Sequence, residues 1–154
     1  MLINLFLKEI PLDLPKSMEI VAKKLSNSTG KKECLERTYD LLGNKYRGYR
    51  IKTFIRSFDF FTDNLESVWN RTGFLHCMTL NYLMRVLLIK SGHFKEEDVR
   101  QRWTTIWLFS PHQYLEVRLG RDKIINVDLW GRVYGIPLGD YAHGFNSMPR
   151  AKLS

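Results

Sequence analysis

Cysteine is scarce in this chain: Cys34 and Cys77 are the two thiols among 154 residues. So few cysteines exclude the disulfide framework that holds many small secreted domains together. A chain of this length can bury a hydrophobic core of its own and does not depend on such bridges. We therefore expect two free thiols in a reducing compartment, with a single Cys34–Cys77 disulfide as the alternative.

Long hydrophobic runs are missing as well. The apolar stretch at residues 2–7 has no basic segment before it and ends at Lys8 and Glu9, so it does not have the form of a secretory signal. No apolar run approaches the roughly 20 residues that a membrane span requires. We therefore expect a cytoplasmic protein without a membrane partner.

The sequence also lacks the residue spacing that is typical of metal sites. No pair of cysteines or histidines has the Cys-x-x-Cys spacing, or a comparable one, that is typical of zinc sites. The sequence therefore predicts no bound metal, and it contains no motif that calls for another cofactor.

Charge of one sign is in excess, with 24 Lys and Arg against 16 Asp and Glu and a net charge of +8. Such a charge permits contact with nucleic acid, acidic protein or anionic lipid. However, the basic residues are spread along the chain, and no known nucleic-acid motif accompanies them. We interpret them as a solvated basic surface and keep nucleic acid as a partner only in an alternative hypothesis.

Hydrophobic periodicity and turn residues divide the chain into helices followed by strands. After an extended lead-in, we expect a helix at 17–25, capped by Ser17, and a second at 31–42, ended by Gly43-Asn44. A short third helix is expected from a cap at Asp63 to Trp69, and a fourth at 77–90. Strands are expected at 102–109, 112–119 and 123–130, and residues 46–61 are ambiguous. This order predicts one α+β domain with an antiparallel sheet. Its parts are a lead-in (1–30), helices and a connection (31–76), the strongest helix (77–92), strands (102–130) and a C-terminal loop region (131–154).

The hydrophobic pattern selects the register of the last hairpin. A three-residue loop at 120–122 sets Leu115 opposite Val127, so the apolar sides of the two strands agree. A two-residue loop would set Leu115 against Asp128 and mix the two faces. Because a slip of one residue turns every side chain to the other face, we expect the first register.

In that register, a histidine and an aspartate come within reach of each other. His112 lies opposite Trp130, and Asp128 is its diagonal neighbour on the same face of the hairpin. Such neighbours are roughly 7–8 Å apart at the backbone, which allows a hydrogen bond between their side chains. An imidazole held by a carboxylate is the base, with its orienting group, of many nucleophilic enzymes.

Two interpretations of Cys77 are possible from the sequence. At the first turn of the 77–90 helix, the dipole and the unpaired amides would lower the pKa of its thiol, and its own amide could donate to an oxyanion. Cys77 also lies three residues before Leu80 on the apolar stripe, where buried and inert cysteines are common. Periodicity alone does not decide between a nucleophile and a core residue.

Three segments resemble motifs of the transglutaminase-like superfamily. Members carry an Arg and a Gly shortly before the nucleophile, then an apolar helix that ends near a Gly; Arg71, Gly73 and Gly92 match these positions around Cys77. The second motif is a strand of the form His-x-aromatic-x-Glu-Val, matched by His112-Gln113-Tyr114-Leu115-Glu116-Val117 with tyrosine in place of the usual tryptophan. The third is an Asp at the end of the next strand, matched by Asp128.

The resemblance covers about residues 38–131. It implies a papain-like α+β fold, in which a nucleophile helix packs on an antiparallel sheet, and a Cys77–His112–Asp128 triad. Leu129 departs from the family, which often has proline there. The family's extra oxyanion donor has no clear match, and Trp69 and Asn70 are the local candidates.

The other histidines and Cys34 are expected to lie outside this site. We interpret Cys34 as structural, His93 as a solvated loop residue, and His143 as the rival base. His76 is interpreted as a surface or second-layer group, because adjacent helical residues point about 100° apart. Whether Glu116 is structural or contacts substrate stays open.

The sequence thus predicts a cysteine enzyme that acts on amide bonds of a protein or peptide through a thioester, most simply a peptidase or amidase. A transglutaminase-type acyltransferase, which forms isopeptide bonds, is one alternative. A non-catalytic basic module that binds acidic protein or nucleic acid is the other.

Overall fold

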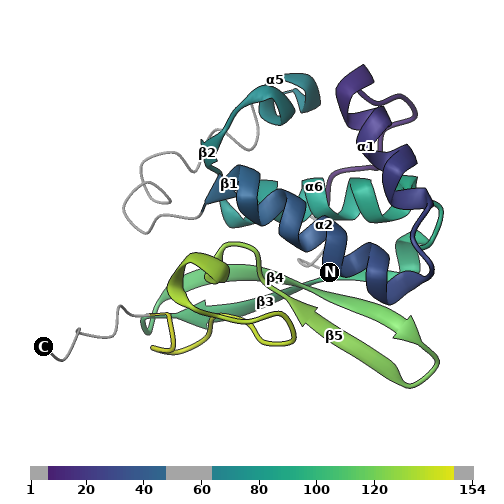
Figure 1. Cartoon of the computed structure of the whole chain (residues 1–154). Helices are drawn as coiled ribbons and strands as arrows, with labels where there is room; N and C mark the ends of the chain where they lie inside the picture. The colour runs from purple at the N-terminus through teal and green to yellow at the C-terminus, as the bar shows by residue number, and fades with distance from the viewer. Residues whose placement is uncertain (1–6, 48–63, 148–154) are drawn as a thin grey trace, which may run out of the picture.

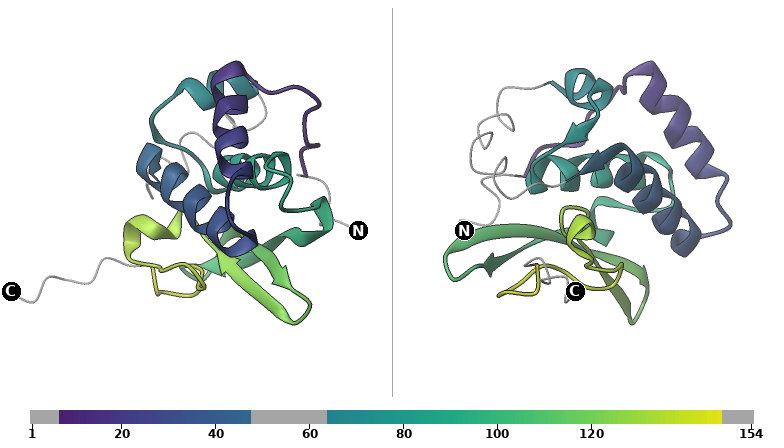
Figure 2. Two further views of the ribbon diagram at one scale, coloured as in Figure 1. Left: turned by 45° about the vertical axis from the view of Figure 1, so that its right-hand side comes forward. Right: turned by 60° about the vertical axis from the view of Figure 1, so that its left-hand side comes forward.

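The computed structural model describes residues 7–47 and 64–147, in which helices are followed by a sheet (Figure 1). The elements in chain order are α1 (Lys16–Ser26), α2 (Lys31–Lys45), β1 (Tyr46–Arg47), α5 (Leu65–Asn70), β2 (Gly73–Phe74), α6 (Cys77–Lys90), η2 (Glu96–Asp98), β3 (Val99–Ile106), β4 (Ser110–Gly120), β5 (Lys123–Val127) and η3 (Gly131–Tyr134). The helices lie on one side of the antiparallel sheet β3-β4-β5 (Figures 1 and 2). The predicted α+β class with an antiparallel sheet is confirmed.

Helix α6 occupies the centre of the core and has the predicted bounds, Cys77 to Lys90. It packs against α1 and α2 on one side and against β4 on the other. Its predicted apolar stripe is buried, with Leu83, Leu87 and Leu88 fully inaccessible. Because neighbours surround it, polar side chains of α6 such as Asn81 and Arg85 are buried too, and each has hydrogen-bond partners. This central position fixes the direction of the helix that begins at Cys77.

The β4–β5 hairpin has the predicted register over most of its length. Leu115 pairs with Val127, and Val117 with Ile125. At the turn, however, the register shifts between Arg118 and Gly120, and Gly120 pairs with Lys123. The tight turn is therefore the two-residue one, and the irregularity in β4 restores the register that the apolar faces require.

Several element ends differ from the prediction. β3 begins at Val99 rather than 102, and β5 ends at Val127 rather than 130, before a turn into η3. Helix α2 continues through Gly43 to Lys45, because Arg132 of η3 packs against this turn. A Cβ on Gly43 would lie 1.7 Å from the Arg132 guanidinium, so the glycine allows a close approach instead of ending the helix.

The predicted helix caps also change. Pro15 precedes α1, and the Ser17 hydroxyl instead accepts a hydrogen bond from the Trp69 indole at 3.0 Å. Asp63 lies outside the described residues; Asn64 caps α5 by accepting the Ser67 amide at 2.7 Å. Of the ambiguous 46–61 stretch, Tyr46–Arg47 forms β1, parallel to β2, and 48–61 lie outside the described residues.

No helix in the described ranges has both the length and the apolar character needed to cross a membrane. Both cysteines are buried free thiols.

Candidate active site

The structure brings Cys77, His112 and Asp128 together, although they come from a helix, a strand and a turn. His112 lies near the start of β4 and Asp128 directly after β5. The His112 Nε2 is 2.7 Å from the Asp128 Oδ2, and both side chains are 1–2% exposed. The Cys77 thiol and the His112 imidazole lie close enough for each to shift the pKa of the other. Since Nε2 is engaged by the carboxylate, Nδ1 is the ring nitrogen left to face the thiol.

The Asp128 carboxylate is held by two backbone amides in addition to the imidazole. Oδ1 accepts the Gly131 N–H at 2.9 Å, and Oδ2 accepts the Ala142 N–H at 2.8 Å. Because both carboxylate oxygens act as acceptors, Nε2 of His112 is the donor in its hydrogen bond to Asp128. A Cβ on Gly131 would lie 2.9 Å from Oδ2, so this approach requires glycine.

One aromatic ring packs on the buried imidazole, and two more pack on that ring. The Trp130 side chain is 1% exposed, and its ring centroid lies 4.9 Å from that of His112. Tyr134 and Trp107 pack on Trp130 in turn, with centroids at 4.9 and 5.9 Å. In such an apolar setting, charge interactions between the site residues are weakly screened.

The start of α6 places the Cys77 amide as well as its thiol. The first hydrogen bond of the helix ladder runs from the Leu80 amide to the His76 carbonyl at 2.9 Å. The amides of the first turn, including that of Cys77, therefore lie outside the ladder and are directed out of the helix end. This geometry suits donation to an oxyanion formed beside the sulfur.

The electrostatics of the site favour a thiolate beside an imidazolium. Burial raises the pKa of the Cys77 thiol, but hydrogen bonds from His112 and His76, with the charges of both rings, outweigh it and lower the pKa from 9.0 to about 6. Burial likewise lowers the pKa of His112, but the charge and hydrogen bond of Asp128, with those of Cys77, raise it from 6.5 to about 10. Transfer of the proton from the Cys77 sulfur to the His112 imidazole is therefore favourable, because each charged group stabilises the other.

His76 contradicts the sequence prediction, because its imidazole contacts the thiol directly. Nδ1 of His76 is 3.6 Å from Sγ of Cys77. The prediction assumed helical geometry, but His76 is the N-cap residue, with an extended backbone at φ −68° and ψ 153°. The rotation of 100° per residue therefore does not apply between these two residues. Histidine is not among the preferred N-cap residues, so the sequence contains no signal for this position.

The remaining candidate residues lie elsewhere. The Cys34 thiol is buried, 3.3 Å from the Ser91 hydroxyl, which agrees with a structural role. His143 is exposed and its ring packs on Tyr141, so it does not occupy the position that His112 has. His93 lies 3.1 Å from the carbonyl oxygen of Ser26.

Glu116 and the local oxyanion candidates have other partners. Glu116 forms an ion pair with Arg102 at 2.7 Å, which favours the structural reading. The Trp69 indole N–H donates to Ser17, so this donor is not available to the site. Asn70 is the last residue of α5. The amides of Gly131 and Ala142 were not foreseen, because backbone donors have no residue signature.

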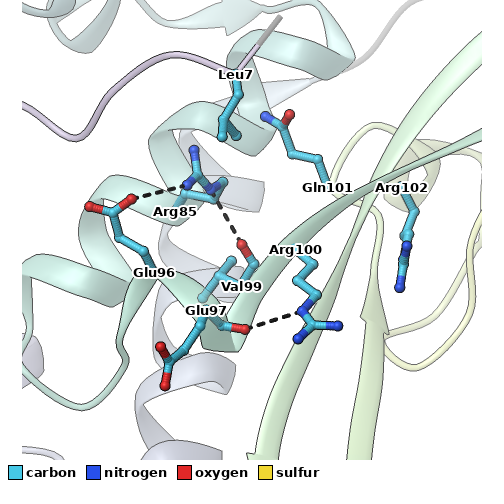
Figure 3. A pocket seen from close by; sticks show the side chains of 8 residues that line it. All are labelled: Leu7, Arg85, Glu96, Glu97, Val99, Arg100, Gln101 and Arg102. Carbon is cyan, nitrogen blue, oxygen red and sulfur yellow. Dashed lines mark hydrogen bonds and ion pairs between the residues drawn. The ribbon is translucent and has the colours of Figure 1, made fainter. Parts of the chain in front are cut away.

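A cavity of about 370 Å³ lies beside α6 at Arg85, eight residues or roughly 12 Å along the helix from Cys77 (Figure 3). Arg85 donates to the carbonyl oxygens of Val99 and Lys8 at 3.4 and 3.3 Å and lies 4.0 Å from the Glu96 carboxylate. These contacts satisfy the guanidinium within the chain. They attach the extended lead-in to α6, so we assign this cavity a structural setting rather than a role in the site.

Within the part of the chain that the structure describes, no group of three or more Asp, Glu, His and Cys side chains is placed to hold a metal ion.

Comparisons with known proteins leave the site to be interpreted from its geometry. No model of a known protein family matches the chain, and neither the curated proteins nor the solved structures include a significant match.

Proposed function

We propose that this protein is a transglutaminase-like cysteine enzyme with a papain-like arrangement, which attacks amide bonds through Cys77. The supporting observation is the buried hydrogen bond between Asp128 and His112, together with the electrostatic coupling of this imidazole to the thiol at the start of α6. A cysteine that merely continued the apolar stripe would not require a histidine and a buried carboxylate behind it.

The steps follow from the positions of the three side chains. His112 takes the thiol proton, and the sulfur of Cys77 forms a bond to the carbonyl carbon of the amide. The negative charge on the carbonyl oxygen is met by the amide of Cys77. The C–N bond then breaks, the leaving amine takes the proton from His112, and a thioester remains on Cys77. Asp128 holds the His112 tautomer throughout and stabilises its charged form.

The breakdown of the thioester distinguishes a hydrolase from an acyltransferase. If water attacks the thioester, His112 accepts a proton from it, and the products are a carboxylic acid and the free thiol. If a primary amine such as lysine attacks, the product is an isopeptide bond. We favour the peptidase or amidase, with a protein or peptide as substrate, because hydrolysis requires no second binding site.

Acyl transfer from p-nitrophenyl acetate to the protein tests this proposal. The thiolate displaces p-nitrophenolate, and an acetyl thioester on Cys77 is detected by mass spectrometry after acid quenching. We expect the adduct in the wild type, none at position 77 in Cys77→Ser, and a strongly reduced rate in His112→Ala. His143→Ala is the matched control, since His143 is exposed and outside the site. Equal acetylation of His112→Ala and wild type would contradict the proposal.

The same preparation separates the alternatives. Incorporation of a fluorescent alkylamine into a glutamine-rich protein would identify the acyltransferase, whereas release of free acid without incorporation identifies the hydrolase. The net charge of +8 motivates the non-catalytic alternative, a basic binding module. Salt-sensitive binding to a polyanion, together with an unreactive Cys77, would favour that module over the enzyme.

A further inference from the structure

The Cys77 thiol has a second imidazole beside it, and the same nitrogen of that ring also serves the helix. Nδ1 of His76 is 3.6 Å from Sγ of Cys77 and 3.4 Å from the amide nitrogen of Met78, whose N–H it accepts as the cap of α6. His76 is partly buried, and its position follows from the extended backbone of the cap residue.

The two hydrogen bonds place opposite demands on this nitrogen. To accept the Met78 N–H, Nδ1 must carry a lone pair and no proton. In that state it also accepts a hydrogen from a neutral thiol. To donate to a thiolate, Nδ1 must carry a proton, and the cap to Met78 is then lost. One proton on His76 therefore exchanges the helix cap for a hydrogen bond to the nucleophile.

We propose that His76 is a positioning residue for Cys77: its Nδ1 holds the thiol at the end of α6 and supplies the thiolate with a second donor, beside His112, as the pH falls. This role in catalysis rests on the proposed function. It extends the pH range in which Cys77 is a nucleophile below the range that His112 alone would support.

Nearby charges decide how readily His76 takes up a proton. Among the described residues, those that shift its pKa are Cys77 and His112, and Asp128 lies behind His112. The imidazolium of His112 opposes a proton on His76, whereas the thiolate favours one. Burial lowers the pKa of His76, but its hydrogen bond to Cys77 and the charge of the sulfur outweigh this and raise the pKa. A proton on His76 is therefore favoured while Cys77 is a thiolate.

Helix capping alone is the competing explanation, and asparagine separates the two. The Oδ1 of asparagine stands where Nδ1 of histidine stands, and asparagine is among the best N-cap residues. However, it cannot be protonated. His76→Asn therefore keeps the cap to Met78 and removes the titrating donor, while His76→Ala removes both.

The experiment is the pH dependence of iodoacetamide alkylation at Cys77, measured by mass spectrometry on the full chain. In wild type, we expect reaction well below the ordinary pKa of a thiol. In His76→Asn, we expect the midpoint to rise by roughly one pH unit, about a tenfold loss of alkylation on the acid side, with an unchanged melting temperature. His76→Ala should show the same shift and a lower melting temperature.

Three further measurements make each outcome decisive. Cys34 is fully buried, so its alkylation reports unfolding in every sample. If His76→Asn unfolds by this criterion, His76→Ser supplies another capping side chain without an imidazole. A folded Asn or Ser variant with the wild-type profile would show that His76 is a cap only and overturn this inference. An ordinary profile in wild type, unchanged by His112→Ala, would instead overturn the proposed function.

Discussion

The substitution Asp128→Asn tests how the carboxylate controls His112. It preserves the size of the side chain but replaces one oxygen by an N–H₂ group. In the wild type, Oδ2 accepts both the His112 Nε2–H at 2.7 Å and the Ala142 N–H at 2.8 Å. An amide nitrogen at that place would face two donors, whereas in the flipped orientation it would face the Gly131 N–H alone. In the first orientation the imidazole moves its proton to Nδ1, which leaves no lone pair towards Cys77; in both orientations the negative charge beside the imidazole is lost.

The size of the effect follows from the pKa of His112. Burial lowers this pKa, but the charge and hydrogen bond of Asp128, with those of Cys77, raise it to about 10. At about pH 8, roughly 99% of His112 is then imidazolium. Asp128 supplies the two largest causes that raise this pKa, so the pKa falls well below 10 without the carboxylate. At the ordinary histidine pKa of about 6.5, roughly 3% would be imidazolium, a decrease of about thirtyfold.

Nitrogen-detected NMR of the four histidines measures this fraction and the tautomer directly. The His112 signals are assigned by their loss in His112→Ala. Asp140→Asn is the matched control, since Asp140 is exposed, lies in the same C-terminal segment and bonds to the Tyr141 amide. If His112 of the Asp128→Asn variant stays charged at about pH 8, the carboxylate does not set the charge of the imidazole, and our reasoning is refuted.

Other substitutions test the support of the site. Gly131→Ala places a Cβ 2.9 Å from the Asp128 Oδ2, so we expect a stability loss of about 1–3 kcal/mol in urea unfolding and slower Cys77 alkylation. The stability of the fold should also depend on pH. The raised pKa of His112 stabilises the folded state fully below about pH 6.5, and this contribution is lost as the pH rises towards 10. The lowered pKa of Cys77 stabilises the folded state fully above about pH 9, and this contribution is lost as the pH falls towards 6. The two nearly cancel between 6.5 and 9, so wild-type stability should change less with pH there than that of Cys77→Ser, which should become less stable as the pH rises. Equal slopes would contradict the coupled pair. Asn81→Ala removes the buried bonds to β4 and should cost about 1–3 kcal/mol by the same unfolding measurement, without changing the His112 tautomer.

Short-range patterns predicted the core of the fold correctly. The apolar spacing of Leu80, Leu83 and Leu87 located α6 to the residue, because a helix buried between layers must repeat its apolar positions along its whole length. The alternation around Leu115 and Val127 predicted the hairpin register, because a slip of one residue would turn these apolar side chains to the other face of the sheet. That register in turn predicted that Asp128 and His112 can meet.

Element ends were less predictable, because distant residues decide them. Glycine usually ends a helix, yet α2 continues through Gly43. The missing side chain leaves space for Arg132, which lies some 90 residues away in the chain. Likewise, Asn64 caps α5, and the Ser17 hydroxyl is used by Trp69 rather than by the first turn of α1. Local propensity contains no information about such partners.

Sequence patterns alone predicted the helix that begins at Cys77 and the pairing of His112 with Asp128, since these depend on periods of 3.6 and 2 residues. Folding then brings the thiol near His112, because α6 packs against β4. Only in the folded chain do the Gly131 and Ala142 amides hold Asp128, and only there does His76 contact the thiol. Backbone donors and cap geometry reach these positions only after the chain has folded, so no pattern of side chains in the sequence predicts them.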